Sequence, residues 1–130
     1  MTHGGAFATV INCMDGRVQE PVIAWMKNEY DVQYVDAVTE PGPICMLAGN
    51  ADRAAVDSMR RRVDISVSKH GSQVVAIVAH HDCAGNPVCR DDQMLQLSAA
   101  IEAVNAWGFG VKVLGLWVDE DWHVHPTALP

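Results

Sequence analysis

The chain has 130 residues, of which 49% are hydrophobic, and it carries a formal net charge of −7. This length and apolar content predict one globular domain over residues 1–130, with enough core to fold on its own. The negative charge argues against nucleic acid or an anionic membrane as a partner, so we expect a small-molecule substrate.

Strands and helices are predicted to alternate along the chain. Apolar runs bounded by turn-forming residues indicate strands at 7–12, 32–38, 74–79 and 111–118. Apolar residues at helical spacing indicate helices at 18–26, 51–69 and from Asp91 or Asp92, as the cap, to Trp107. We expect a loop from 39 to 50, and we expect residues 119–130 to pack across a sheet edge or a neighbouring subunit.

This alternation predicts an α/β fold with a doubly wound, mainly parallel, four-stranded sheet of order 2-1-3-4 and helices on both faces. No apolar run approaches the roughly 20 residues that span a bilayer, and the chain does not open on a secretory signal pattern. We therefore expect no membrane association and a cytoplasmic location. In that reducing compartment, cysteines favour thiolate chemistry or metal binding over disulfides.

Two neighbouring strands of the predicted sheet end at residues that can bind a metal. The first runs into Cys13-Met14-Asp15-Gly16-Arg17, and the third runs into His80-His81-Asp82-Cys83. In an open parallel sheet, the carboxyl ends of such strands meet where ligands bind. Two thiolates and one imidazole suit Zn²⁺ and leave its fourth tetrahedral position open. We therefore predict zinc on Cys13, His80 and Cys83.

Asp15 and Arg17 are the candidate catalytic residues beside this metal set. Asp15 could bind the zinc and close the site. It could instead pair with Arg17, leave the metal open and accept a hydrogen bond from a hydroxide on the metal. The residues alone leave both roles of Asp15 open.

The two motifs resemble the Cys-x-Asp-x-Arg and His-x-x-Cys motifs of the β-class carbonic anhydrases, and the resemblance covers roughly residues 7–118. It implies a zinc lyase of the carbonate dehydratase type, in which zinc-bound hydroxide reversibly hydrates carbon dioxide to bicarbonate. It also implies an Asp15–Arg17 dyad and a homodimer or higher homo-oligomer. The chain would be a short member without the family's N-terminal helical arm. Thr39-Glu40-Pro41-Gly42 replaces the family's Arg-Asn-Ala-Gly, and Ala84 replaces a glycine.

Two other functions fit the same residues. One is hydrolysis of a carbon dioxide analogue, carbonyl sulfide or carbon disulfide. The other is a catalytically silent interaction domain that zinc stabilises.

Six further residues could contribute to a site. Cys45 and Cys89 are interpreted as structural thiols, although the six-residue offset from Cys83 could bring Cys89 near the metal. For His81 and Asp82, orienting the ligands and facing solvent in a turn are equal alternatives. A local or interfacial role is favoured over metal binding for the remaining two, His123 and His125.

Overall fold

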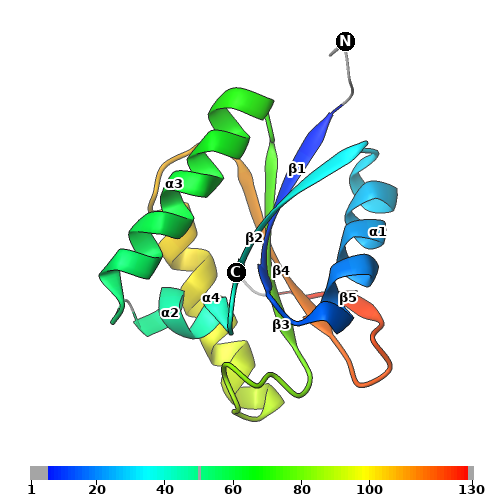
Figure 1. Cartoon of the computed structure of the whole chain (residues 1–130), viewed down its shortest axis with the longest axis vertical. Coiled ribbons are helices and arrows are strands. Elements are labelled where there is room, and N and C mark those ends of the chain that lie inside the picture. Colours follow the sequence, from blue (N-terminus) through cyan, green and yellow to red (C-terminus); the bar gives the residue numbers. More distant parts are fainter. Residues whose placement is uncertain (1–5, 50, 129–130) are drawn as a thin grey trace.

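The structure, a computed structural model, describes residues 6–49 and 51–128. Figure 1 shows strands and helices alternating along the chain. The strands are β1 (Phe7–Cys13), β2 (Tyr34–Glu40), β3 (Val74–His80), β4 (Lys112–Val118) and β5 (Val124–Pro126). The helices are the short 3₁₀ helix η1 (Gly16–Val18), α1 (Gln19–Tyr30), α2 (Pro43–Gly49), α3 (Arg53–His70) and α4 (Arg90–Asn105).

The strands form one sheet of order β2-β1-β3-β4-β5, in which the first four are parallel and β5 runs antiparallel to β4. The predicted α/β fold and the order 2-1-3-4 are therefore confirmed. The sheet has one strand more than predicted, because Val124–Pro126 pairs with the edge of β4. This pairing agrees with the expectation that the chain's last segment packs across a sheet edge.

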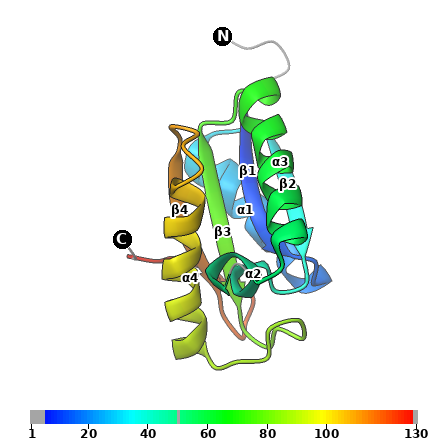
Figure 2. The same cartoon turned by 90° about the vertical axis from the view of Figure 1, so that its left-hand side faces the viewer.

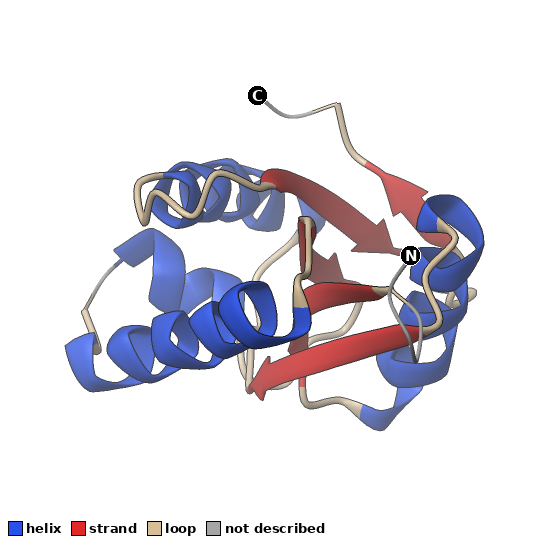
Figure 3. Ribbon diagram, turned by 90° about the horizontal axis from the view of Figure 1, so that it is seen from above, coloured by secondary structure: helices blue, strands red, loops and turns tan. Residues whose placement is uncertain are grey.

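Helices cover both faces of the sheet, with α1 on one face and α2, α3 and α4 on the other (Figures 1 and 3). Strand β3 lies in the middle and is buried at every position. Its residues alternate between the two layers: Val75, Ile77 and Ala79 pack with the larger helical layer, and Val74, Ala76 and Val78 pack on the side of α1. A continuous apolar run thus marks a strand that is covered on both faces.

The expectation of a loop over 39–50 is wrong in its centre. Strand β2 continues to Glu40, and Pro43 begins helix α2, which packs against α4 (Figure 2). Proline fits the first position of a helix because that position has no intrahelical partner for its N–H. Ile44 and Leu47, three residues apart, bury one face of this short helix.

The ends of α3 and α4 differ slightly from the predicted ranges. Helix α3 ends at His70 with Gly71 in the left-handed conformation, as a glycine at that position allows. Helix α4 instead begins at Arg90, so Asp91 and Asp92 lie within its first turn and neither is the cap. Their charges still favour the helix, because they lie beside its positive end.

Among the described residues, no helix has both the length and the apolar character needed to cross a bilayer.

Candidate metal centre

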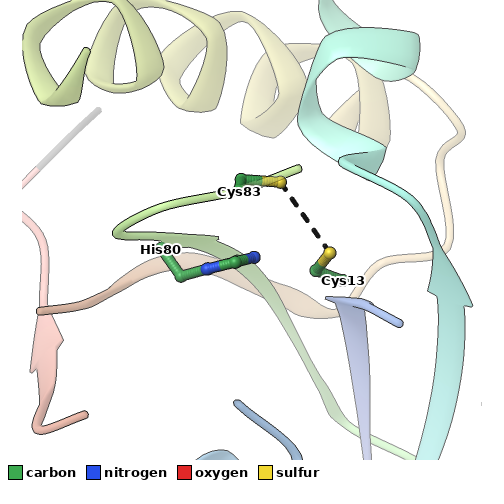
Figure 4. Close-up of side chains that lie close together, drawn as sticks. All are labelled: Cys13, His80 and Cys83. Atoms are coloured by element: carbon green, nitrogen blue, oxygen red, sulfur yellow. Dashed lines mark hydrogen bonds between the residues drawn. The ribbon is translucent and has the colours of Figure 1, made fainter. Parts of the chain in front are cut away.

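The carboxyl ends of β1 and β3 bring three potential ligands together. The strands pair as far as Ile11 and Ile77, and the chain then delivers Cys13, His80 and Cys83 just beyond that point. One ligand atom from each lies within 4.8 Å of the other two, and all three residues are buried (Figure 4). The adjacency predicted from strand order is confirmed.

One ring nitrogen of His80 forms a hydrogen bond and the other does not. Nδ1 lies 2.7 Å from the carbonyl oxygen of His81. A carbonyl can only accept, so Nδ1 donates and a neutral ring leaves a lone pair on Nε2. Nε2 is buried and has no hydrogen-bond partner among the described residues. An unpaired buried polar atom costs about 1–3 kcal/mol, and a metal ion would use this lone pair.

The two sulfur atoms also have the spacing of a zinc site. The Sγ atoms of Cys13 and Cys83 are 3.8 Å apart (Figure 4). Zinc–sulfur bonds of about 2.3 Å at a tetrahedral angle separate two sulfurs by about 3.8 Å. Both cysteines are free thiols. The residues present therefore fit a zinc ion.

The local electrostatics favour one thiolate over two. Burial opposes the thiolate of Cys13, but the protonated form of the His80 ring and the backbone N–H groups of Asp15 and Gly42 stabilise it more, and its pKa falls to about 7. Burial and the charge of Cys13 raise the pKa of Cys83 to about 11. A cation is therefore required to ionise both thiols near neutral pH, and its binding releases protons.

Asp15 is paired with Arg17 and lies outside the three-residue group. Its Oδ2 is 2.7 Å from Arg17 Nη2, and its Oδ1 accepts from Arg17 Nε at 3.1 Å and from the Arg17 backbone N–H at 2.9 Å. These bonds lower the pKa of Asp15 to about 2, although partial burial opposes the shift. Of the two roles left open by the sequence, the geometry favours the Arg17-paired one.

Asp82 and His81 both contact this centre, each in a different way. Asp82 meets Arg17 through its carboxylate, 3.3 Å from Nη1, and through its backbone oxygen, 3.1 Å from Nη2. His81 contributes its carbonyl to His80, while its side chain is exposed. Asp82 therefore orients Arg17, and His81 orients a ligand through its backbone.

The other two cysteines, and the two histidines of the chain's last segment, lie outside the group. Cys45 and Cys89 are exposed, and neither belongs to the ligand group, so Cys89 does not lie near the two ligand cysteines despite its six-residue offset from Cys83. His125 Nε2 lies 2.6 Å from Asp119 Oδ2, which is the local contact favoured from the sequence. The backbone N–H of His123 donates to the other oxygen of Asp119.

The chain matches the profile of a protein family described as "Putative carbonic anhydrase" over residues 3–128. It belongs to this carbonic anhydrase family. A comparison with curated proteins gives no significant match.

Solved β-carbonic anhydrases share the fold of this carbonic anhydrase family member. Isoform I of Trichomonas vaginalis has a TM-score of 0.61 at 14% identity, over 92% of this chain and 80% of that one. The enzyme of Aspergillus fumigatus has a TM-score of 0.60 at 15% identity, over 95% and 76%. A β-carbonic anhydrase of Sordaria macrospora, described as tetrameric, has a TM-score of 0.62 at 13% identity, over 96% and 83%. At such identities the similarity shows the fold, which is that of the β-carbonic anhydrases.

One residue that supports the centre of this carbonic anhydrase family member was not found from the sequence. Beyond Ile77, β3 no longer pairs with β1, so the backbone of His80 lacks a strand on that side. The buried side chain of Gln93 fills the position: its Nε2 donates to the His80 oxygen at 2.8 Å, and its Oε1 accepts from the His80 N–H at 3.2 Å. Its signal in the sequence is a polar residue on the buried stripe of α4, four positions before Leu97.

Gln93→Leu is expected to destabilise the protein by about 2–3 kcal/mol, because it leaves the buried N–H and C=O of His80 unpaired. Urea unfolding measures the change. Gln73→Leu is the control, since the side chain of Gln73 is exposed, just before the start of β3. Equal stability of Gln93→Leu and the parent would contradict the role of the side chain.

Two loops meet closely beside the ligands. A Cβ atom on Gly85 would lie 2.6 Å from the carbonyl carbon of Pro41, and a Cβ on Gly42 would lie 2.6 Å from the Cβ of Asn86. Glycine at position 85 is therefore required for the contact. The contact holds Gly42 where its N–H reaches the Cys13 sulfur.

Gly85→Ala is expected to lower stability by about 1–3 kcal/mol, because backbone atoms of Pro41 must move to admit the new methyl group. Thermal unfolding checks this. Gly49→Ala is the control, because a Cβ there meets nothing within 4 Å and the position lies in a helix. Similar melting temperatures for the two variants would show that the loop contact is not tight.

Proposed function

We propose that the protein is a zinc-dependent carbonic anhydrase that reversibly hydrates carbon dioxide to bicarbonate. The observation that carries the proposal is the free, buried Nε2 of His80 facing two cysteine sulfurs, with the Asp15–Arg17 pair beside them. Membership of the carbonic anhydrase family supports it.

In this proposal Cys13, His80 and Cys83 hold the zinc. Bound there, zinc would supply the Lewis acidity that makes water a nucleophile near neutral pH. The two thiolates would offset the charge of the ion. A nearby cation such as Arg17 would therefore help to stabilise negative charge on the oxygen of this water. The backbone carbonyl of His81 keeps the proton of His80 on Nδ1 and so reserves Nε2 for the metal.

Asp15 orients the nucleophile, and Arg17 holds Asp15. A carboxylate has about four acceptor positions, and three are occupied by the short bonds from Arg17, so one remains for the nucleophile. Because the pKa of Asp15 is about 2, this group is an acceptor throughout the neutral range. Carbon dioxide would take the oxygen of this water to form bicarbonate, which keeps one of the water's protons, and the other proton would pass to solvent.

We further propose that residues 1–130 form one domain that assembles into homodimers or higher homo-oligomers. The tetrameric relative of Sordaria macrospora supports assembly, and so does Met14, which is 63% exposed although it lies between Cys13 and Asp15. A second copy could cover it.

The free cysteines fit a reducing compartment, so we place the protein in the cytoplasm.

Zinc content and stopped-flow hydration of carbon dioxide, measured on the same preparation, test the proposal. We expect about one zinc per chain and hydration well above the uncatalysed rate. Zinc with sulfide release from carbonyl sulfide or carbon disulfide, and without hydration, would identify the hydrolase instead. Zinc without either activity would identify a structural site, and a folded protein without zinc would refute the proposal.

A further inference from the structure

The guanidinium of Arg17 contacts groups from three parts of the chain. Asp15 accepts hydrogen bonds from Nε and Nη2. Asp82 accepts one from Nη1 with its carboxylate and one from Nη2 with its backbone oxygen. The ring of Trp122 lies against the guanidinium, with its centroid 4.4 Å from the Arg17 Cζ atom. Four of the five N–H donors are thus engaged, and the hydrogen bonds of Arg17 reach the metal centre through Asp15.

The turn between β4 and β5 holds the backbone of Trp122 in an unfavourable conformation. Its φ is +63°, in the left-handed region that bulky side chains rarely adopt. Asp119 fixes the turn: its Oδ1 accepts from the N–H groups of Asp121 and His123, and its backbone oxygen accepts from Trp122 N–H. The strained backbone is therefore maintained by its surroundings, which is typical of functional positions.

The Asp82 carboxylate is a weaker support for Arg17 than Trp122. Its side chain is 71% exposed and 3.3 Å from Nη1, so solvent screens most of the attraction. The Trp122 ring instead covers a face of the guanidinium of an Arg17 side chain that is 45% exposed, and it limits how the guanidinium plane can rotate. The orientation of the plane sets whether Nε and Nη2 can meet both Asp15 oxygens at once.

We propose that Trp122 is a positioning residue of this centre, which stacks on Arg17 and thereby fixes the orientation of Asp15. The proposal rests on the proposed function for its catalytic consequence, whereas the stacking itself can be tested without activity. It makes the β4–β5 turn, about forty residues after the second metal motif, a part of the candidate active site.

Proton NMR of ¹⁵N-labelled protein tests the stacking directly. We expect a nuclear Overhauser effect between the Arg17 side chain and the Trp122 indole in the parent, and an upfield ring-current shift of the Arg17 δ and ε protons. The shift should vanish in Trp122→Leu and largely persist in Trp122→Phe. Trp107→Leu is the control, because Trp107 is also half-buried but packs on the other face of the sheet.

Steady-state hydration kinetics supply the second readout. Trp122→Leu should lower kcat about tenfold with little change in KM and unchanged zinc content, and Trp122→Phe should restore most of the loss. A parent without the Overhauser effect, or a Trp122→Leu variant with the parent's Arg17 shifts and kcat, would overturn the proposal. If Trp122→Leu does not fold, the parent spectrum and Trp122→Phe still decide. If the parent has stacking but no hydration, the proposed function fails while the stacking stands.

Discussion

Cys83→Ser is expected to lose both the zinc and the hydration activity. Serine keeps the size of the side chain, but its hydroxyl does not ionise near neutral pH and so does not replace an anionic sulfur ligand. Two ligands, Cys13 and His80, would remain on a site built for three. We expect zinc to fall below about a tenth of an equivalent per chain and hydration to fall about a thousandfold or more, because the bound metal supplies the chemistry. Metal analysis and stopped-flow assays on one preparation measure both.

Cys89→Ser is the matched control for this loss. Cys89 is a free thiol six residues further along the chain, is exposed and lies outside the ligand group. It should keep the parent's zinc and activity. If Cys83→Ser retains a full equivalent of zinc, or if both variants lose it, the proposed ligand set is wrong.

Asp15→Asn is expected to separate metal binding from catalysis. Asp15 lies outside the ligand group, so the variant should keep its zinc. An amide accepts on one atom only and carries no charge, so it loses the two-oxygen pairing with Arg17 and orients the nucleophile poorly. A positioned acid–base group contributes about a hundredfold or more to a rate, and we expect kcat to fall by at least that factor. Asp52→Asn, a helix cap that also accepts a backbone hydrogen bond, is the control for lost charge.

The pKa of Asp15 adds a prediction about pH. Because Arg17 lowers this pKa from 3.8 to about 2, the carboxylate stabilises the folded state above about pH 4, and that contribution disappears as the pH falls through about 2. Asp15 is therefore ionised throughout pH 6–9. Any change of the parent's kcat in that range must come from another group, and an Asp15→Asn variant with the parent's kcat would refute the role of Asp15.

The sheet was predictable because its central strands carry the strongest pattern in the chain. Residues 74–79 are uniformly apolar and are covered on both faces, and the polar residues begin where the strand ends. With strands one and three as neighbours, the order 2-1-3-4 brings Cys13 close to His80 and Cys83. The site could be located because a parallel sheet gathers the carboxyl ends of its strands at one edge.

The features missed from the sequence depend on contacts between distant segments. Strand β5 has three residues and ends in proline, so only its pairing with β4 makes it a strand. Helix α2 begins within Pro41-Gly42-Pro43, and because these residues are typical of turns, the sequence predicts a loop there. The choice between the two roles of Asp15 depended on where Arg17 lies, and Asp82 and Trp122, far away in the sequence, determine that.

The Gln93 side chain makes the centre dependent on the order in which the chain is completed. All three candidate ligands precede residue 84, so a growing chain has synthesised the whole set before α4 exists. Until Gln93 docks, the backbone N–H and C=O of His80 at the end of β3 lack these hydrogen-bond partners, and the position of His80 is less restricted. Tight metal capture should therefore wait for the docking of α4, and a nascent chain that stops before it should hold zinc only weakly.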